Sequence, residues 1–302
     1  MISLKPYPTR SSRLGIPVRG RDAVLAGMSS YAPSTRRAER YRDLTWMLVW
    51  ALGPRVLPGP AFTWVPPMSE HDWVELDGIL RSEVGSWDAV SVSQRAAGRP
   101  GFTLMVIGDG VPRCVVRFEE EGNQGVATEV EALKAVEQFD VRSFHAPRVL
   151  KAGVLGGMAY SIVEAFRLSR HRIVDSPNLE LMTEEIACAL SQLPRDPTTP
   201  DHWTPAHGDF TPWNLRQPSN GLPVLLDWET AGYAPAGFDR VLYEVSAAAI
   251  GRGRPPGSIP EALHGYMRDA VETRIREATA AGVRPDPLNQ EILRLIEGER
   301  GE

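Results

Sequence analysis

The chain has 302 residues, of which 42% are hydrophobic and 24% are charged, a composition typical of a globular protein. No apolar run approaches the roughly 18 residues that span a bilayer, and no apolar segment follows the N-terminal arginines, so we expect neither a membrane span nor a secretory signal. The two cysteines, Cys114 and Cys188, lack metal-site spacing and imply no disulfide framework, which favours a cytoplasmic protein.

The charge is distributed unevenly along the chain. Residues 1–55 contain ten Lys and Arg but only three Asp and Glu, a net charge of +7, so the other 247 residues carry −12 within a total of −5. Such a basic segment can contact nucleic acid, an anionic lipid or an acidic partner, or it can fold back onto its own acidic remainder. We favour the last interpretation and expect no nucleic-acid partner, because no nucleic-acid-binding module is present.

The N-terminal part is predicted to be irregular and then helical. Residues 1–35 contain four prolines and show little periodicity. Apolar residues recur at helical spacing over 36–52, and Ser69 followed by Asp72 is typical of the start of a second helix. These segments form a predicted extension, residues 1–86.

A small β-rich unit is predicted to follow, over residues 87–166. Alternating polar and apolar residues favour strands, and Gly108-Asp109-Gly110 is a strong hairpin signal. The predicted order is three strands, one helix and two strands, at 89–94, 103–107, 113–118, 125–138, 148–151 and 158–166. Residues 167–302 are predicted to be mainly helical, with helices at 179–193, 259–281 and 288–297.

The segment from His207 to Asn214 reads His-Gly-Asp-Phe-Thr-Pro-Trp-Asn, and Asp227 follows 18 residues after Asp209, at the end of a predicted buried strand. Phosphoryl transfer needs metal ions, phosphate positioning and a group that receives the proton of a hydroxyl. Asp209 can face an acceptor hydroxyl, and one amide oxygen plus one carboxylate is a sensible Mg²⁺ ligand set, since Mg²⁺ completes its shell with water and phosphate oxygens. The alternative is that these residues only cap a helix and brace turns.

These two motifs resemble the catalytic loop and the metal-binding segment of the aminoglycoside phosphotransferase/choline kinase family, which has a protein-kinase-like fold. The resemblance covers the chain from about Val90 to its C-terminus. It implies Asp209 as catalytic base, His207 as the residue that orients the loop, and Asn214 and Asp227 as Mg²⁺ ligands. The second motif reads Asp-Trp-Glu instead of the Asp-Phe-Gly of protein kinases, which argues against a protein kinase.

The resemblance also implies a fold and further site residues. The expected class is α+β and bilobal: a five-stranded antiparallel sheet with one helix, a mainly helical C-lobe from residue 167, and the N-terminal helical extension. Asp239 resembles a position that braces the catalytic loop. Glu229 either assists the metal or substrate, or forms a structural ion pair.

ATP is the expected co-substrate, and its site is expected to lie between the lobes. Arg117 would contact the α- and β-phosphates and pair with a helix glutamate, either Glu129 or its competitor Glu131. The phosphate-covering loop would be residues 94–101, which include Gly98. The hinge Glu164, Ala165 and Phe166 would bind adenine through its backbone.

The expected activity is an ATP- and Mg²⁺-dependent phosphotransferase that acts on a hydroxyl group of a small polar metabolite or antibiotic. The alternative is a catalytically inactive, kinase-like module that binds a nucleotide or a partner. Arg117, in a position where a lysine is usual, and the glycine-poor loop favour this alternative. Asp209, Asn214 and Asp227 favour the enzyme.

Overall fold

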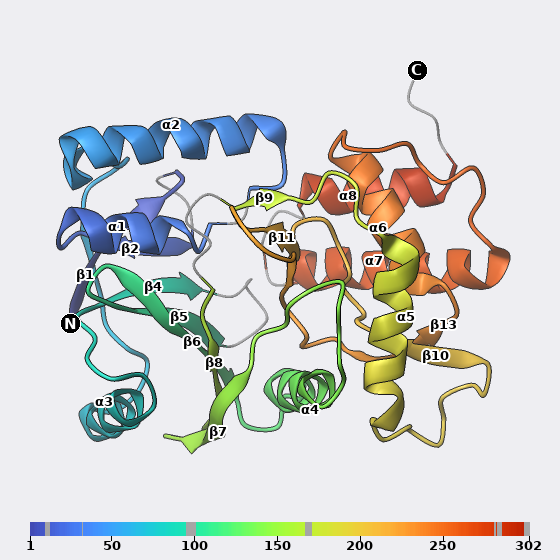
Figure 1. The fold of residues 1–302 in the computed structure, drawn as a ribbon, viewed down its shortest axis with the longest axis horizontal. Coiled ribbons are helices and arrows are strands. Elements are labelled where there is room, and N and C mark those ends of the chain that lie inside the picture. Colours follow the sequence, from blue (N-terminus) through green and yellow to red (C-terminus); the bar gives the residue numbers. More distant parts are fainter. Residues whose placement is uncertain are drawn as a thin grey trace.

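The computed structural model describes residues 1–9, 13–31, 33–94, 101–166, 171–280, 282 and 286–298. These residues form an α+β protein with two lobes, one built on a large sheet and one mainly helical (Figure 1). The predicted class is therefore confirmed. No helix in the described ranges is long and apolar enough to cross a membrane.

The sheet of the N-lobe is larger than the sequence predicts. Its described part has eight antiparallel strands in the order β3-β1-β2-β4-β5-β6-β8-β7. The five strands from β4 to β7 are the predicted ones, and three strands of the N-terminal extension continue the sheet because β2 pairs with β4. The strands are β1 (Ile2–Tyr7), β2 (Leu14–Pro17), β3 (Phe62–Trp64), β4 (Ala89–Gln94), β5 (Gly101–Gly108), β6 (Val111–Glu120), β7 (Val149–Leu155) and β8 (Met158–Glu164).

The two faces of this sheet are covered by different helices. Alternate side chains of β5 and β6, such as Phe102 and Phe118, pack against α3 (Glu70–Val84). On the other face Ile107 packs against α1 (Arg21–Met28), and Val115 lies against the cluster that contains α4 (Gly125–Glu137). Since side chains alternate along a strand, Arg117 shares the face of Val115 and points between the lobes.

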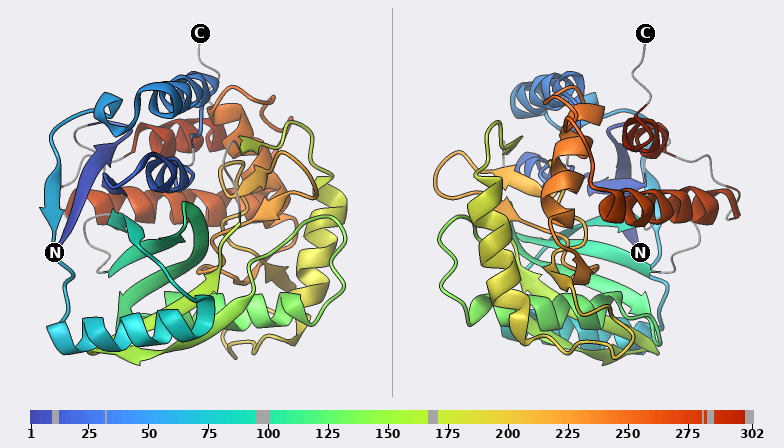
Figure 2. Two further views of the ribbon diagram at one scale, coloured as in Figure 1. Left: turned by 60° about the vertical axis from the view of Figure 1, so that its left-hand side comes forward. Right: turned by 90° about the vertical axis from the view of Figure 1, so that its right-hand side faces the viewer.

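The prediction that residues 1–35 are irregular is wrong. This segment contains β1, β2 and α1, and α1 lies between the sheet and α2 (Arg36–Leu52), which forms the outer edge of the molecule (Figures 1 and 2). A short 3₁₀ helix, Pro54–Val56, follows α2. The two predicted helices of the extension are confirmed, with Thr35 and Ser69 accepting the N-cap hydrogen bonds of α2 and α3.

The described part of the C-lobe, from residue 171 onward, consists of four α-helices and short strands. A core cluster that includes Phe210 and Trp228 joins it to α4 and β8, so the two lobes share packed side chains. The helices are α5 (Leu179–Ala189), α6 (Phe238–Ala249), α7 (Glu261–Ala280) and α8 (Pro287–Ile296), with a 3₁₀ turn at Leu190–Gln192. The strands are β9 (Arg172–Ile173), β11 (Leu215–Gln217) and β12 (Val224–Leu225) in one sheet, and β10 (Trp203–Ala206) with β13 (Gly232–Pro235) in another.

Candidate active site

The loop from His207 to Asn214 follows β10, and hydrogen bonds to the first turn of α6 hold it in place. Asp239, in the first turn of α6, accepts hydrogen bonds from the backbone nitrogens of His207 (2.7 Å) and Gly208 (3.1 Å). Burial raises the pKa of Asp239 to about 7, although these two hydrogen bonds act in the opposite direction. Asp239 thus braces the loop, in the position that the family resemblance implies.

His207 is fully buried and links the loop to the strand that precedes Asp227. Its Nδ1 accepts a hydrogen bond from the backbone nitrogen of Asp209 (3.2 Å), so the ring proton lies on Nε2, which donates to the carbonyl oxygen of Leu226 (3.1 Å). Burial lowers the pKa of His207 to about 4. A neutral imidazole therefore positions the loop, and it lies 4.5 Å from the ring of Trp228, centroid to centroid.

The carboxylate of Asp209 is held from two sides. Asn214 donates from Nδ2 to Asp209 Oδ2 at 2.8 Å and to the Asp209 carbonyl oxygen at 3.0 Å. Arg274, from α7, donates to Asp209 Oδ1 at 3.1 Å. Sequence reasoning missed Arg274 because it lies 65 residues away and belongs to no local motif. Two donors therefore fix the orientation of this carboxylate.

Asp227 lies two residues after the end of β12 and next to the loop. The backbone nitrogen of Leu226 donates to the carbonyl oxygen of Asn214 at 2.9 Å, which ties the two motifs together. Asp227 has a φ of 69°, in the left-handed region that non-glycine residues seldom adopt. Such strained backbone is concentrated at functional sites, where the surrounding contacts maintain it.

Arg117 binds three carboxylates at once. It donates to Asp227 Oδ1 at 2.6 Å and to Glu229, and its Nε lies 3.6 Å from Glu129 Oε2. Burial disfavours its charged form, but the carboxylates of Glu129 and Asp227 outweigh that effect, so the pKa of Arg117 is raised. Of the two glutamates that the sequence left open, Glu129 is buried beside Arg117, whereas Glu131 is exposed.

The donor set at the loop fits Mg²⁺. Both amide hydrogens of Asn214 are used by Asp209, which leaves the amide oxygen to face a cation, and the carboxylate of Asp227 is the second oxygen donor. In the described part of the chain no group of three or more His, Cys, Asp or Glu residues is placed to hold a metal ion. A site with one carboxylate and one amide suits Mg²⁺, which keeps several water or phosphate ligands.

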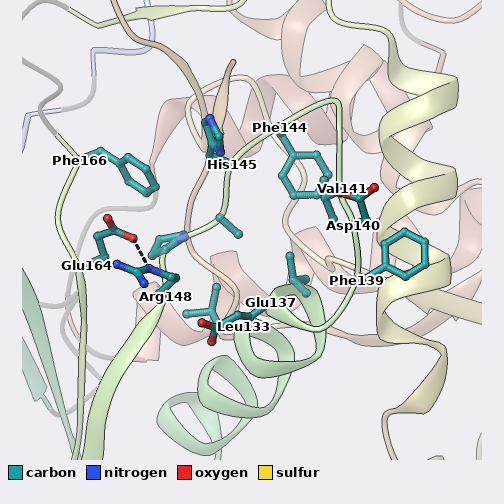
Figure 3. Close-up of a pocket in the computed structure, with 13 residues that line it drawn as sticks. Leu133, Glu137, Phe139, Asp140, Val141, Phe144, His145, Arg148, Glu164 and Phe166 are labelled. Carbon is teal, nitrogen blue, oxygen red and sulfur yellow. Dashed lines mark hydrogen bonds and ion pairs between the residues drawn. The ribbon is translucent and has the colours of Figure 1, made fainter. Parts of the chain in front are cut away.

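The predicted hinge lies beside a pocket of about 400 Å³ (Figure 3). Glu164 and Phe166 line it together with the C-terminal end of α4 and the segment 139–148, and Glu164 pairs with Arg148 at 3.1 Å. The backbone nitrogen of Glu164 donates to the carbonyl oxygen of Arg148, so this N–H is already bonded. Ala165 follows the last residue of β8, Glu164, and precedes Phe166. The predicted phosphate-loop residue Gly98 lies outside the described residues.

The comparisons with known proteins agree with the motifs. Residues 131–277 match the model of the phosphotransferase enzyme family, so the family resemblance is confirmed. No curated protein matches the chain.

Several solved structures are similar to this chain over about three quarters of its length. The GDP and kanamycin complex of APH(2'')-IIia is 13% identical, covers 74% of this chain and 98% of its own, and has a TM-score of 0.46. A putative fructosamine-3-kinase from Haemophilus somnus 129PT is 11% identical, with coverages of 75% and 97% and a TM-score of 0.44. The APH(3'')-Id complex with ADP and streptomycin, from Streptomyces rimosus ATCC10970, is 14% identical, with coverages of 76% and 99% and a TM-score of 0.39.

Proposed function

We propose that this chain, which matches the phosphotransferase enzyme family over residues 131–277, is a small-molecule kinase. It would transfer the γ-phosphoryl group of ATP to a hydroxyl group of a small polar metabolite or antibiotic. The observation that supports this best is the juxtaposition of Asp209, Asn214 and Asp227, with Arg117 bonded to Asp227. Chance capping would not bring these groups together from a loop, a strand end and the other lobe.

Asp209 is the proposed catalytic base. Its carboxylate would accept the proton of the acceptor hydroxyl while that oxygen forms a bond to the γ-phosphorus and the bond from phosphorus to the bridging oxygen breaks, releasing ADP. Asn214 and Arg274 hold this carboxylate in place, and His207 positions the loop that carries it. A base fixed in this way loses little orientational freedom in the transition state.

Asn214 and Asp227 are the proposed ligands of Mg²⁺. The ion, when bound, would neutralise charge on the phosphates. Arg117 would bind the α- and β-phosphates of ATP, while Glu129 stays paired with its Nε. The phosphates would compete with Asp227 and Glu229 for the other two nitrogens of the guanidinium group. Ala165 and Phe166 are proposed to contact the adenine.

The charge beside the base bears on the acceptor. Arg274 lies 3.1 Å from Asp209 and its side chain is 30% exposed, so a guanidinium group borders the place where the acceptor hydroxyl would bind. Its positive charge offsets the negative charge of the Asp209 carboxylate, which would otherwise attract an ammonium group on the acceptor. The pair therefore removes a preference for polycationic acceptors, and neutral acceptors such as sugars belong in the panel on equal terms.

One observation favours the inactive binding module as a second candidate. Asp209 and Asp227 are both bonded to arginines, and Arg117 also occupies Glu229. If these ion pairs do not open when nucleotide binds, the carboxylates stay unavailable for metal and acceptor.

Acceptor-dependent release of ADP from MgATP separates the two candidates. We expect turnover with at least one member of a panel of sugars, hydroxy acids, amino alcohols and aminoglycosides, with GTP tested in parallel. Asp209→Asn should lower kcat by about 10²- to 10⁴-fold, the usual contribution of a general base. Asp201→Asn, which changes an exposed aspartate of the same lobe, is the matched control. ATP binding without turnover of any acceptor would support the binding module instead.

A further inference from the structure

Helix α2 packs against the rest of the protein through a face on which two of the three buried residues are polar or charged. Its buried residues are Arg42, Thr45 and Val49. Arg42 is 1% exposed, donates to the carbonyl oxygen of His171 at 2.6 Å and pairs with Asp43 at 3.0 Å. The polar side of this amphipathic helix thus supplies part of its buried contacts.

The opposite side of α2 exposes a broad apolar surface. Six large side chains of the helix are more than a third exposed: Tyr41 (43%), Leu44 (52%), Met47 (54%), Leu48 (39%), Trp50 (63%) and Leu52 (66%). At 3.6 residues per turn they occupy about half of the helix circumference, which we call the α2 outer face. Soluble proteins expose single apolar residues routinely, but contiguous patches mark interaction sites.

The exposed charged residues of α2 and its C-terminal flank are all basic. Its exposed residues other than the apolar ones are Arg36, Arg37 and Arg40, all near the N-terminal end, and Arg55 is exposed just beyond the C-terminal end. Both acids of the helix are engaged, Glu39 with Arg252 and Asp43 with Arg42. Beside the α2 outer face, the helix therefore carries positive charge for which the described residues show no ion pair, and it offers no exposed carboxylate.

Two protein occupants fit this surface poorly. A second copy docked through the same face would bring arginines together without a carboxylate to pair them, because a two-fold contact uses the same surface twice. A different protein would need hydrogen bonds, about one per 100–200 Å² of interface, but arginines near the ends are the main donors on offer. The hydroxyl of Tyr41 already donates to the carbonyl oxygen of Pro8.

We infer that the α2 outer face docks onto an anionic lipid surface, with the apolar side chains in the headgroup–acyl boundary and the arginines on the lipid phosphates. Helices with a Trp- and Leu-rich face and basic residues bind membranes in this way without crossing them. Helix α2 lies along the outer edge of the molecule (Figure 2), and the six apolar side chains of this face are exposed. The inference does not depend on the proposed kinase activity.

Co-sedimentation with vesicles tests this inference on the full chain. We expect binding to phosphatidylcholine vesicles that contain phosphatidylglycerol, and much weaker binding to phosphatidylcholine alone. Arg36→Gln combined with Arg37→Gln and Arg40→Gln should weaken binding roughly a hundredfold, since each basic residue near such a surface contributes about a factor of five. Leu44→Glu with Met47→Glu should abolish binding.

The controls separate docking from misfolding and from other occupants. Val74→Glu, at a residue of α3 that is 64% exposed, should bind vesicles as the wild type does, and every variant should keep the wild-type circular dichroism melt. No binding to anionic vesicles, equal binding to neutral ones, or unchanged binding of Leu44→Glu with Met47→Glu would overturn the inference. So would a wild-type dimer in solution that this double variant dissociates, because a second copy would then cover the face.

Discussion

Arg117 is the residue through which the two lobes meet at the candidate site. Its strand β6 belongs to the N-lobe, whereas Asp227 and Glu229 belong to the C-lobe, and Glu129 comes from α4. A planar guanidinium group can serve three carboxylates because its donors point in several fixed directions. A lysine has a single ammonium group and cannot reach all three. The arginine is thus matched to a site where carboxylates from both lobes converge.

Replacing Arg117 with Lys tests this interpretation. We expect kcat/KM for ATP to fall roughly tenfold to a hundredfold, because at least one charge-assisted hydrogen bond, worth about 1.5–3 kcal/mol, is lost. Steady-state kinetics and calorimetric ATP binding measure the effect. Arg113→Lys, which changes an arginine of the same strand paired with the exposed Asp109, is the control. Wild-type kinetics for Arg117→Lys would show that its extra donors do not matter.

Gly208 is a second residue whose type is fixed by its surroundings. Its φ is +81°, and a Cβ atom there would lie 2.1 Å from the carbonyl oxygen of Thr230. Gly208→Ala must therefore move the loop or Thr230, and we expect about 1–3 kcal/mol of lost stability in urea unfolding together with a severe loss of turnover. Gly232→Ala, where a Cβ meets nothing within 4 Å, should change neither. An active, stable Gly208→Ala variant would contradict the strained loop.

At the scale of elements, the helices and strands with strong local sequence signals are the ones that the sequence predicts. Helices α2 and α3 have both a 3.6-residue apolar pattern and a capping residue, and in β5 buried and partly buried residues alternate over 101–106. Helix α1 was missed because all residues from Ala23 to Met28 are buried, so it has no polar face that would reveal its period. Strand β1 was missed because Pro6 lies within it.

The residues of the candidate site also differ in whether a local sequence signal predicts them. The loop and Asp227 were predicted from one contiguous stretch of sequence, since the motif itself carries the chemistry. Arg274 could not be predicted, because its contact with Asp209 depends on how α7 packs against the loop. Helix α6 was not predicted as an element, although the bracing position of Asp239 at its start was.

The substitution Asp239→Asn tests whether α6 stabilises the loop from His207 to Asn214. In Asp239→Asn the amide nitrogen would face the backbone nitrogen of either His207 or Gly208, which replaces one acceptor with a donor. We expect a loss of about 1–3 kcal/mol in unfolding free energy, because a buried N–H is left without a partner. Asp269→Asn, at an exposed residue of α7, is the control. If both variants unfold at the same urea concentration, Asp239 does not brace the loop.

For the molecule as a whole, the N-terminal extension packs against both lobes. It continues the N-lobe sheet through β2, and it reaches the C-lobe through Arg42 on the carbonyl oxygen of His171 and through the carbonyl oxygen of Pro33, which accepts from Arg216. Arg216 is fully buried, and burial lowers its pKa to about 9. The extension therefore does pack onto the rest of the chain. In the described residues, however, the arginines of the basic segment 1–55 form ion pairs only with its own Asp22 and Asp43, so the predicted pairing with the acidic remainder is not seen there.

His171 makes this packing sensitive to pH. Burial, and then the charges of Arg216 and Arg42, lower its pKa from 6.5 to about 3, and its Nε2 lies 3.3 Å from the carbonyl oxygen of Ser29 in the extension. In the unfolded chain the imidazole takes up a proton as the pH falls through 6.5, whereas the folded protein keeps it neutral. A depressed pKa thus contributes stability that is present above pH 6.5 and is lost as the pH falls toward 3, by up to about 1.4 kcal/mol per pH unit.

Urea unfolding across this pH range, compared between the wild type and His171→Gln, isolates the effect. His207, whose pKa is also lowered, and Asp239, whose raised pKa acts with the opposite sign, contribute equally to both proteins. The free energy of unfolding of His171→Gln should therefore fall less steeply on acidification, by about one proton in the linkage slope. His202→Gln, at an exposed histidine, should follow the wild type. Parallel curves for His171→Gln and the wild type would mean that His171 gains a proton in the folded protein as readily as in the unfolded chain. The packing of the extension on the C-lobe would then not depend on a neutral His171.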